Sequence, residues 1–337
     1  MSTILVTGSA GFIGFHCARH LLARGHRVIG FDALTDYYDP ALKRARHAVL
    51  EAEDGFVPVI ARLEAPGALD ALFAAERPEL VLHLAAQAGV RYALENPASY
   101  LRSNVDGSFA LLEAARQHPP AHLMLASTSS VYGANPSRPF RETDRADWPL
   151  SFYAATKKAT EAMAHAYAHL HGLPTTMFRF FTVYGPWGRP DMALFRFTRA
   201  MLEGRPIEIY NQGDMARDFT YIDDLVSGIL HLAAAPPHRA ENPRAIAPGD
   251  SLSPAAPWRV VNIGAGQPMR LMDFVAALEA ALGIEAQKTF LPMQPGDMAE
   301  TWADAGLLAD LVGPMPRTPV ETGVRAFVDW YRGHYGV

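Results

Sequence analysis

Short apolar segments alternate with helical patterns along the first two-thirds of the chain. The segments that predict strands are residues 4–7, 27–31, 80–83, 122–126 and 176–180. Most of these segments are continuously apolar, which is typical of parallel strands that are covered on both faces. Apolar positions recur at helical spacing between them, over residues 12–24, 68–76, 100–117 and 153–171. This alternation predicts an α/β fold built on a doubly wound parallel sheet.

The pattern changes after about residue 180, where Gly- and Pro-rich turns separate shorter elements. We therefore predict a large lobe over residues 1–180 and a smaller, discontinuous C-terminal lobe over residues 181–337. Parts of residues 215–265 are expected to return to the large lobe. Residues 235–257 are rich in Pro and Ala and poor in large apolar groups, which predicts an exposed loop. A final helix is predicted from Thr318, an N-cap residue followed by a proline.

Composition and charge narrow the function classes. The 337 residues are 49% apolar and 19% charged, an ordinary composition for a globular protein. The net charge of −5 provides no basic field, so we expect no nucleic-acid partner, and an anionic ligand would need locally placed arginines. No apolar run approaches the ~18 residues of a membrane span. A strand is predicted almost directly after Met1, which leaves no room for a signal sequence, so we expect a cytoplasmic protein.

Few side chains suggest thiol or metal chemistry. Cys17 is the single cysteine, so no intrachain disulfide can form, and its helical context predicts a buried apolar thiol. His165 and His169 lie one helical turn apart and have the spacing of a metal-chelating pair. No third ligand with suitable spacing is evident, so we predict no metal site and a solvated or subunit-facing position for the two histidines.

A glycine motif follows the first predicted strand and opens the first predicted helix. It reads Gly8-Ser9-Ala10-Gly11-Phe12-Ile13-Gly14. Its glycines allow a tight turn and a close approach of the backbone to a pyrophosphate, while the helix N-terminus adds unpaired amides. The second strand ends at Asp32, whose carboxylate is placed to accept hydrogen bonds from ribose hydroxyls and to repel a 2′-phosphate. We predict NAD in preference to NADP, in contact with Gly8, Gly11, Phe12, Ile13, Gly14 and Asp32.

The glycine spacing, together with Leu84-Ala85-Ala86 after a predicted strand, resembles the extended short-chain dehydrogenase/reductase family. This resemblance implies a Rossmann-type sheet. The further residues that it places at NAD are Leu63, Leu84, Ala85 and Ala86. The chain departs from the family pattern at Arg62, where relatives commonly have an Asp that faces the adenine. Arg62 has no hydrogen-bond acceptor, so this contact is not expected here.

Two groups of side chains indicate the chemistry. Tyr153 and Lys157 lie four residues apart on one face of a predicted helix. The Lys157 ammonium and a cationic nicotinamide would lower the phenol pKa from about 10 toward neutrality, as a general base requires. The run Ser127-Thr128-Ser129-Ser130 follows a predicted strand and places hydroxyls at its carboxyl end, where ligands bind in open α/β sheets. The resemblance implies that Thr128, Tyr153 and Lys157 are catalytic and that the last two also contact NAD.

The residues after Thr128 distinguish the reactions that this resemblance allows. Sugar-nucleotide dehydratases have Asp-Glu there, and the Glu serves the elimination of water, while UDP-glucuronate decarboxylases tend to have a Glu. This chain has Ser129-Ser130, which offers no acid. Reversible oxidation at C4 of a sugar needs only Tyr153, Thr128 and NAD, so the sequence favours an epimerase. We expect Ser127, Ser129 and Ser130 to face the substrate.

Segments beyond residue 178 extend the resemblance to bacterial UDP-glucuronate 4-epimerases over nearly the whole chain. They are residues 179–192 and 215–219, with a supporting run at residues 36–40 and another at residues 87–92. This resemblance implies interconversion of UDP-glucuronate and UDP-galacturonate through a 4-keto intermediate, with tightly bound NAD. It also implies a homodimer, because the helices predicted over residues 100–117 and 153–171 form a four-helix contact in many relatives.

The same resemblance assigns residues to the nucleotide-sugar substrate. It places Arg217 at the UDP pyrophosphate, which suits guanidinium geometry, and Asp297 in the substrate site. Arg189 is the expected partner of the sugar carboxylate, with Thr182 as a hydroxyl donor. A bidentate pair between Arg189 and this carboxylate would supply both charge and orientation.

Three alternatives remain open from the sequence. Two are enzymes of the same kind, namely a UDP-glucose/galactose-type epimerase, which would turn over neutral sugars, and a UDP-glucuronate decarboxylase, which would release CO2. The third is a non-catalytic NAD-sensing protein on the same scaffold, because a fold does not determine a function. Tyr153, Lys157 and Thr128 disfavour the sensor, since a sensor need not retain them.

Overall fold

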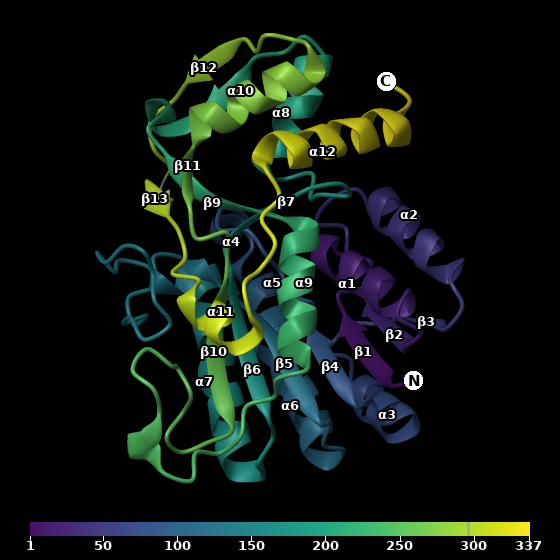
Figure 1. Cartoon of the computed structure of the whole chain (residues 1–337). Helices are drawn as coiled ribbons and strands as arrows, with labels where there is room; N and C mark the ends of the chain where they lie inside the picture. The colour runs from purple at the N-terminus through teal and green to yellow at the C-terminus, as the bar shows by residue number, and fades with distance from the viewer. Residues whose placement is uncertain (295–296) are drawn as a thin grey trace.

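A seven-stranded, wholly parallel sheet lies at the centre of the computed structural model, which describes residues 1–294 and 297–337 (Figure 1). Its strand order is β10-β6-β5-β4-β1-β2-β3. The strands are β1 (Thr3–Thr7), β2 (Arg27–Asp32), β3 (Phe56–Ile60), β4 (Leu80–His83), β5 (His122–Thr128), β6 (Thr175–Phe180) and β10 (Trp258–Ile263). The strand order reverses between β1 and β4, which is where doubly wound sheets bind their ligands. The predicted fold class is confirmed.

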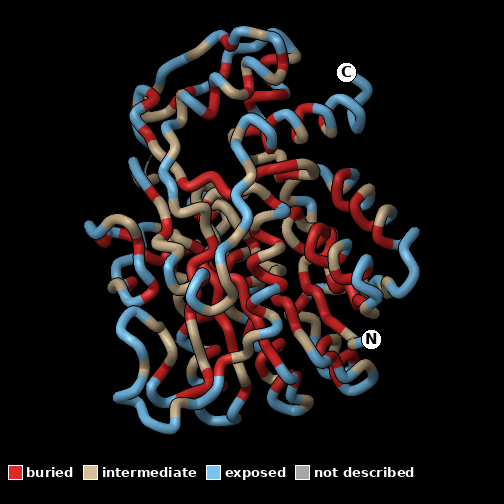
Figure 2. The backbone as a smooth tube through the Cα atoms, viewed as in Figure 1, coloured by how far each residue is buried: buried red, intermediate tan, exposed pale blue. Residues whose placement is uncertain are grey.

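Helices cover both faces of this sheet, which explains why its strands are continuously apolar. On one face, Ile4 and Val6 of β1 pack with α1 (Phe12–Leu22) and α9 (Ile222–Ala233). On the other face, Leu5 packs with α3 (Ala68–Glu76), α6 (Gly107–Gln117) and α7 (Phe152–His171). Figure 2 shows the buried strands running through the centre of the molecule between these layers. Alternate residues of a strand therefore enter different cores.

Three elements of the large sheet and its covering helices were not predicted from the hydrophobic pattern. They are β3, β10 and α2 (Pro40–Glu51). Strand β3 carries Pro58, which is tolerated because β3 lies at the sheet edge, where a missing N–H costs little. Helix α2 has a polar composition, yet its start carries a local signal, since the Asp39 carboxylate accepts a hydrogen bond from Ala41 N and Pro40 occupies the first turn.

The single helix predicted over residues 100–117 is three segments. They are α5 (Pro97–Tyr100), a π-helical turn (Leu101–Asp106) and α6, and they follow the short helix α4 (Tyr92–Glu95). Asn104 lies in the π-helical turn and is buried. Its side chain accepts a hydrogen bond from Gln87 N (2.8 Å) and donates to Gln87 O (3.0 Å) and Thr156 Oγ1 (3.0 Å). The turn thus fixes the segment after β4 against helix α7.

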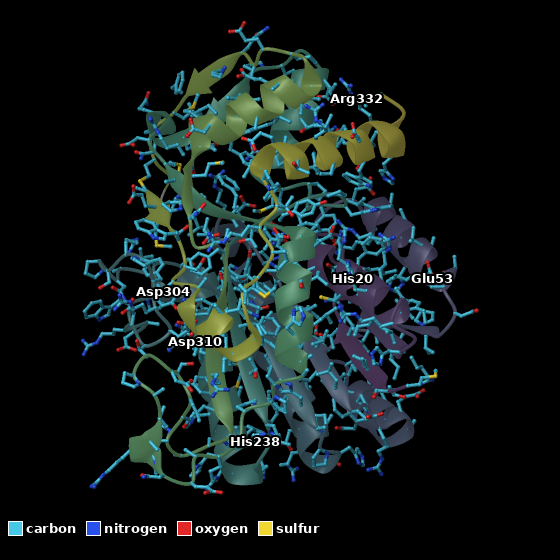
Figure 3. The ribbon with its side chains drawn as sticks, viewed as in Figure 1. His20, Glu53, His238, Asp304, Asp310 and Arg332 are labelled. Carbon is cyan, nitrogen blue, oxygen red and sulfur yellow. The ribbon has the colours of Figure 1, made fainter. Side chains whose placement is uncertain are left out.

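Helix α11 (Gly306–Val312) packs against α9 and β10, and most other remaining elements form a smaller layer above the carboxyl ends of the large sheet (Figure 1). Its strands are β7 (Thr182–Tyr184), β9 (Ala216–Tyr221), β11 (Pro268–Arg270) and β13 (Glu300–Thr301) in one sheet, with β8 (Ile207–Ile209) and β12 (Lys288–Phe290) as a separate pair. Its helices are α8 (Ala193–Leu202), α10 (Leu271–Leu282) and α12 (Val320–Tyr335). The rings of Phe219 and Phe274 stack in its core at 4.0 Å between centroids. In Figure 3, Arg332 of α12 lies at one end of the molecule, and His238, which belongs to the loop after α9, lies at the other.

The beginning of α12 differs from the sequence prediction. Thr318 does not cap this helix, because the N-cap position is Pro319 and no side chain caps it. Instead, the backbone N–H and the hydroxyl of Thr318 donate to the Asp224 carboxylate of α9, at 2.7 and 2.9 Å. Thr318 therefore anchors the closing helix to the layer that covers the large sheet.

The loop over residues 235–257 is mostly exposed and carries one short helical turn (Pro243–Ala245). It folds back onto α7, where His165 Nε2 lies 2.8 Å from Ser253 Oγ and His169 Nδ1 lies 2.8 Å from Ala255 O. Both histidines therefore contact a loop of their own chain, with His169 exposed, as expected for a solvated position, and His165 partly buried. Within residues 1–294 and 297–337, no helix combines the length and apolarity needed to cross a membrane.

Candidate active site

A cleft of about 920 Å³ opens at the carboxyl ends of the large-sheet strands, below the smaller layer. Every site residue predicted from the sequence lines it: Gly8, Gly11, Phe12, Ile13, Gly14, Asp32, Leu63, Leu84, Ala85, Ala86, Ser127, Thr128, Ser129, Ser130, Tyr153, Lys157, Thr182, Arg189, Arg217 and Asp297. These residues come from positions spread over nearly the whole chain. The parallel strands bring them together because all of their carboxyl ends lie at one edge of the sheet.

The glycine loop between β1 and α1 leaves space where a cofactor could approach the backbone. Gly8 has φ +76°, and a Cβ there would lie 2.8 Å from Ala85 N. A Cβ on Gly14 would lie 2.1 Å from Gly8 O, so only glycine lets this helix pack so closely on its own loop. The loop and the amides at the start of α1 therefore fit a dinucleotide pyrophosphate.

Asp32 holds the loop in shape from the end of β2. Its two carboxylate oxygens accept hydrogen bonds from Ala10 N (3.0 Å) and Leu34 N (2.8 Å). Each oxygen retains a second lone pair that a ribose hydroxyl could use. Lys43 of α2 also lines this end of the cleft, and its Nζ donates to Thr35 O (2.6 Å) and Thr35 Oγ1 (2.9 Å). Burial lowers the pKa of Lys43, and the Asp32 charge opposes that shift.

The proposed catalytic side chains lie at the end of β5 and in the first turns of α7. Ser151 caps α7 by accepting a hydrogen bond from Ala154 N (3.1 Å), so the helix begins where Tyr153 enters the cleft. Thr128 is the last residue of β5, and its Oγ1 accepts from Ser130 N (3.2 Å). This bond sets the turn that directs the hydroxyls of residues 128–130 toward the cleft.

Burial is the main cause of the pKa shifts in this centre. It raises the pKa of the Tyr153 phenol, and the neighbouring Thr128 hydroxyl and the Arg189 charge oppose that shift. Burial lowers the pKa of Lys157 to about 8, and the Glu161 carboxylate opposes that change. The lowered phenol pKa expected from the sequence includes the positive charge of bound NAD, so it stays a prediction for the NAD-bound protein.

A buried ion pair supports the catalytic centre from behind. Arg179 of β6 donates two hydrogen bonds to Glu161 of α7, both at 2.8 Å, and both side chains are almost fully buried. Ser127 Oγ donates to the same carboxylate at 2.6 Å. Ser127 lines the cleft, yet its proton is used by Glu161, so it has no donor to offer a substrate.

Arg189 occupies the substrate end of the cleft with an acidic partner beside it. Its Nε and Nη2 donate to the two Asp191 oxygens at 3.1 and 2.5 Å, and Tyr37 Oη donates to the same carboxylate at 3.2 Å. Asp191 engages Nε–H and one N–H of Nη2. Both N–H groups of Nη1 and the second N–H of Nη2 remain for a further acceptor, so the bidentate contact with a sugar carboxylate stays a prediction.

Arg217 and Asp297 lie on the wall formed by the smaller layer. Arg217 Nη1 donates to Ala299 O (2.8 Å) and Ala216 O (3.0 Å), and burial lowers its pKa while Asp297 opposes that shift. Asp297 also accepts a hydrogen bond from Arg91 Nη2 (3.2 Å). The Arg91 guanidinium lies 4.5 Å from the centre of the Tyr210 ring. Arg91 thus connects the two walls of the cleft.

Comparison with known proteins identifies the family of this chain. Residues 4–246 match the model of the NAD dependent epimerase/dehydratase family, which is more than half of the chain. The chain belongs to the NAD dependent epimerase/dehydratase family. Membership confirms the predicted resemblance and identifies the protein as an enzyme of this type with NAD as its cofactor.

Individual relatives of this family cover almost the whole chain. A probable UDP-glucuronate 4-epimerase of Rhizobium meliloti (strain 1021) is 56% identical, over 98% of this chain and 97% of the relative. UDP-glucuronate 4-epimerase 1 of Arabidopsis thaliana is 46% identical, over 99% of this chain and 77% of the plant protein. The crystal structure of UDP-glucuronic acid 4-epimerase from Bacillus cereus, in complex with UDP-glucuronic acid and NAD, is 32% identical with a TM-score of 0.85, over 99% and 100% of the two chains.

Several residues in the cleft of this epimerase/dehydratase family member were missed by sequence reasoning. They are Tyr37, Lys43, Arg91, Asp191 and Tyr210. The run at residues 36–40 carried the family resemblance, and the cap at Asp39 could have identified α2 and hence the inward position of Lys43. The contacts of Arg91 and Tyr37 could not have been found this way, because their partners are 206 and 154 residues distant in sequence.

Replacing Glu161 by Gln should destabilise the protein by about 3–5 kcal/mol at neutral pH, because the buried Arg179 would lose its counter-charge. Burial alone would raise the pKa of Glu161, but Arg179 lowers it to about 2, from an ordinary 4.5. The stabilisation is therefore present above about pH 4.5 and lost as the pH falls toward 2. Denaturant unfolding of both proteins from pH 7 downward measures this, and the difference should shrink below about pH 4.5. Glu203→Gln, at the surface, is the control and should change little; an equal loss there would contradict the explanation.

Proposed function

We propose that this protein is a UDP-glucuronate 4-epimerase that interconverts UDP-glucuronate and UDP-galacturonate through a 4-keto intermediate, with NAD tightly bound. The supporting observation is the combination of Ser129 and Ser130 after Thr128 with Arg189 in the same cleft. The two serines offer no acid for elimination, and the arginine offers a positive charge to a sugar acid. The names of the relatives described above support the same reaction.

The proposed cofactor contacts come from the loop ends of the large sheet. The glycine loop, with Gly8, Gly11, Phe12, Ile13 and Gly14, would hold the pyrophosphate. Asp32 would accept the adenosine ribose hydroxyls, and Leu63, Leu84, Ala85 and Ala86 would line the remaining length. Tyr153 and Lys157 would hold the nicotinamide ribose. NAD, when bound, supplies the redox chemistry, because it accepts a hydride from C4 of the sugar and returns it to either face.

Tyr153 is the proposed general base. Its phenolate removes the proton from the C4 hydroxyl as the carbonyl forms, and it returns that proton to the C4 oxygen in the reverse half-reaction. Lys157 stabilises the phenolate by its charge, and Thr128 holds the C4 oxygen by a hydrogen bond. Because the proton that Tyr153 removes is returned in the second half-reaction, Tyr153 ends each cycle in its starting protonation state.

The 4-keto intermediate of a sugar acid is a β-keto acid, which can lose CO2. That loss is fastest when the bond from C5 to the carboxylate is perpendicular to the carbonyl plane. Arg189 Nη1 and the Thr182 hydroxyl are proposed to hold the carboxylate away from this orientation. Asp191 restrains Arg189 through two hydrogen bonds and accepts a third from Tyr37, so the guanidinium can act as a fixed point of reference.

The smaller layer is proposed to bind the UDP moiety. Arg217 would contact the pyrophosphate, since a guanidinium matches paired phosphate oxygens. Asp297 would remain bonded to Arg91 and line the substrate site. Ser129 and Ser130 would face the sugar, while Ser127 would act through Glu161 rather than by donating to the substrate. The cytoplasmic location and the domain division at residue 180 stay predictions from the sequence.

Incubation of the purified protein with UDP-glucuronate, without added NAD, should convert it to a stable mixture with UDP-galacturonate. The measurement is NMR of the anomeric signals together with CO2 release. Tyr153→Phe should reduce the rate by ~10²–10⁴-fold, because it removes the base. Pentose nucleotide as the main product would identify a decarboxylase. Turnover of UDP-glucose alone would identify the neutral-sugar epimerase, and retention of NAD without any turnover would favour the sensor.

Arg189→Met should weaken UDP-glucuronate binding by ~10–100-fold, because it removes a charge-assisted hydrogen bond to the carboxylate. It should also increase the share of pentose nucleotide among the products, since the carboxylate becomes free to rotate. Calorimetry and the NMR assay measure the two effects. Arg199→Met, on the exposed side of α8, is the matched control. An Arg189→Met protein with unchanged product ratio would refute the restraint on the carboxylate.

We also propose a homodimer that forms through α6 and α7. Phe109 of α6 is 50% exposed, and Leu101 and Phe152 are exposed close to the same helices. Light scattering during gel filtration should give twice the monomer mass of 36.8 kDa. Phe109→Glu should shift the protein toward the monomer, because burying the new charge in an apolar interface is unfavourable. A monomeric wild-type protein at micromolar concentration would contradict the proposal.

A further inference from the structure

Arg46 of α2 is fully buried, and its hydrogen bonds connect two functional segments. Nη1 donates to Ala10 O (2.8 Å) in the glycine loop and to Tyr38 Oη (2.8 Å). Nη2 donates to Trp187 O (2.6 Å) and Gly188 O (3.3 Å), in the turn that precedes Arg189. One guanidinium therefore touches both the loop proposed for the NAD pyrophosphate and the turn that carries Arg189.

The charge of Arg46 has no direct counter-charge among the described residues. All four of its acceptors are neutral: three backbone carbonyls and one phenol. A buried guanidinium without an ion-pair partner is unfavourable unless a negative charge approaches it. Ala10 lies inside the glycine motif, so a dinucleotide diphosphate bound at this loop would bring negative charge toward Arg46.

The turn on the other side of Arg46 has an unusual backbone. Trp187 has φ +62°, a left-handed conformation that is uncommon for a large side chain. Three further contacts hold this turn in place. His16 Nε2 of α1 lies 3.0 Å from Pro186 O, and the Trp187 ring lies 5.2 Å from the rings of Phe15 and of Trp330. Such a conformation persists only where surrounding contacts over-determine it.

Arg189 follows this turn directly. Gly188 N donates to Gly185 O (3.1 Å) and Met192 N donates to Arg189 O (3.2 Å), so the backbone on both sides of Arg189 is in tight turns. A change in the position of Trp187 would therefore move the point from which the Arg189 side chain enters the cleft. Arg46 and His16 determine that position through the carbonyls of residues 186–188.

We propose that Arg46 is a positioning residue that couples the NAD loop to the turn carrying Arg189. Its charge favours NAD through the pyrophosphate, and its hydrogen bonds to Trp187 and Gly188 aim Arg189 at the sugar carboxylate. The second half of this proposal rests on the proposed function, whereas the first half does not. NAD and an acidic nucleotide sugar should then bind cooperatively, whereas the affinity for UDP alone should not depend on Arg46.

The test compares Arg46→Met with Arg44→Met, an exposed arginine on the same helix. Calorimetry would measure NAD binding to the NAD-stripped proteins, then UDP-glucuronate and UDP binding to the NAD-loaded proteins. Both would be prepared with Tyr153→Phe to prevent turnover. We expect Arg46→Met to weaken NAD and UDP-glucuronate binding by about tenfold or more each, with UDP binding unchanged. Arg44→Met should match the parent protein in all three.

Arg46→Lys separates the two halves of the proposal and replaces Arg46→Met if that variant does not fold. A lysine keeps the charge near Ala10 but cannot reach four acceptors, so NAD binding should recover while UDP-glucuronate binding stays weak. Equal weakening of UDP and UDP-glucuronate would overturn the proposal and indicate a general structural role. Unchanged binding of both NAD and UDP-glucuronate in Arg46→Met would also overturn it. A parent protein that binds NAD but not UDP-glucuronate would refute the proposed function and leave the NAD half to be decided separately.

Discussion

The catalytic end of the cleft depends on the buried pair of Glu161 and Arg179. It joins α7 to β6, and through Ser127 it also joins both to β5. Thr128 follows Ser127 directly, and Lys157 lies one helical turn before Glu161. The three elements that carry the proposed base, its charged partner and the Thr128 hydroxyl are thus held together at one carboxylate. Because the pair is buried, a small relative movement of these elements would break charged hydrogen bonds in a medium of low dielectric constant.

The layer of the large sheet and the smaller layer meet at the same cleft, and the contacts there are of two kinds. The catalytic end depends on a closed ion pair, whereas Arg46 and His16 hold the turn at residues 186–188 through backbone carbonyls. Hydrogen bonds to carbonyls fix the backbone of this turn and do not depend on which side chains the turn carries. This arrangement leaves the side chains of residues 187 and 189 available for packing and for substrate, while the backbone that carries them is bound to the cofactor-binding layer.

The sequence predictions whose residues the structure brings into one cleft concerned features that are local in the chain. The glycine motif, the Tyr153 and Lys157 spacing and the hydroxyls after β5 each depend on a few consecutive residues, and the parallel sheet gathers them at one edge. Arg46, Arg91 and Asp191 were not predicted as a group because their contacts join segments that are distant in sequence. The sequence also could not show how far the Tyr153 phenol is removed from solvent, which raises its pKa in the protein without NAD. The π-helical turn at Asn104 escaped prediction because its cause is a contact with Gln87 and Thr156.

The pairing of Arg189 with Asp191 changes how selectivity for a sugar acid can be understood. A free arginine would attract a carboxylate strongly and could hold it in several orientations. An arginine whose Nε and Nη2 already bind an aspartate presents only its outer N–H groups and belongs to a nearly neutral pair, so its attraction is weaker and its direction is defined. A reversible epimerase must release both of its products and must keep a β-keto acid from losing CO2. Weak, directed binding meets both requirements better than strong binding, since only orientation, and not affinity, protects the intermediate.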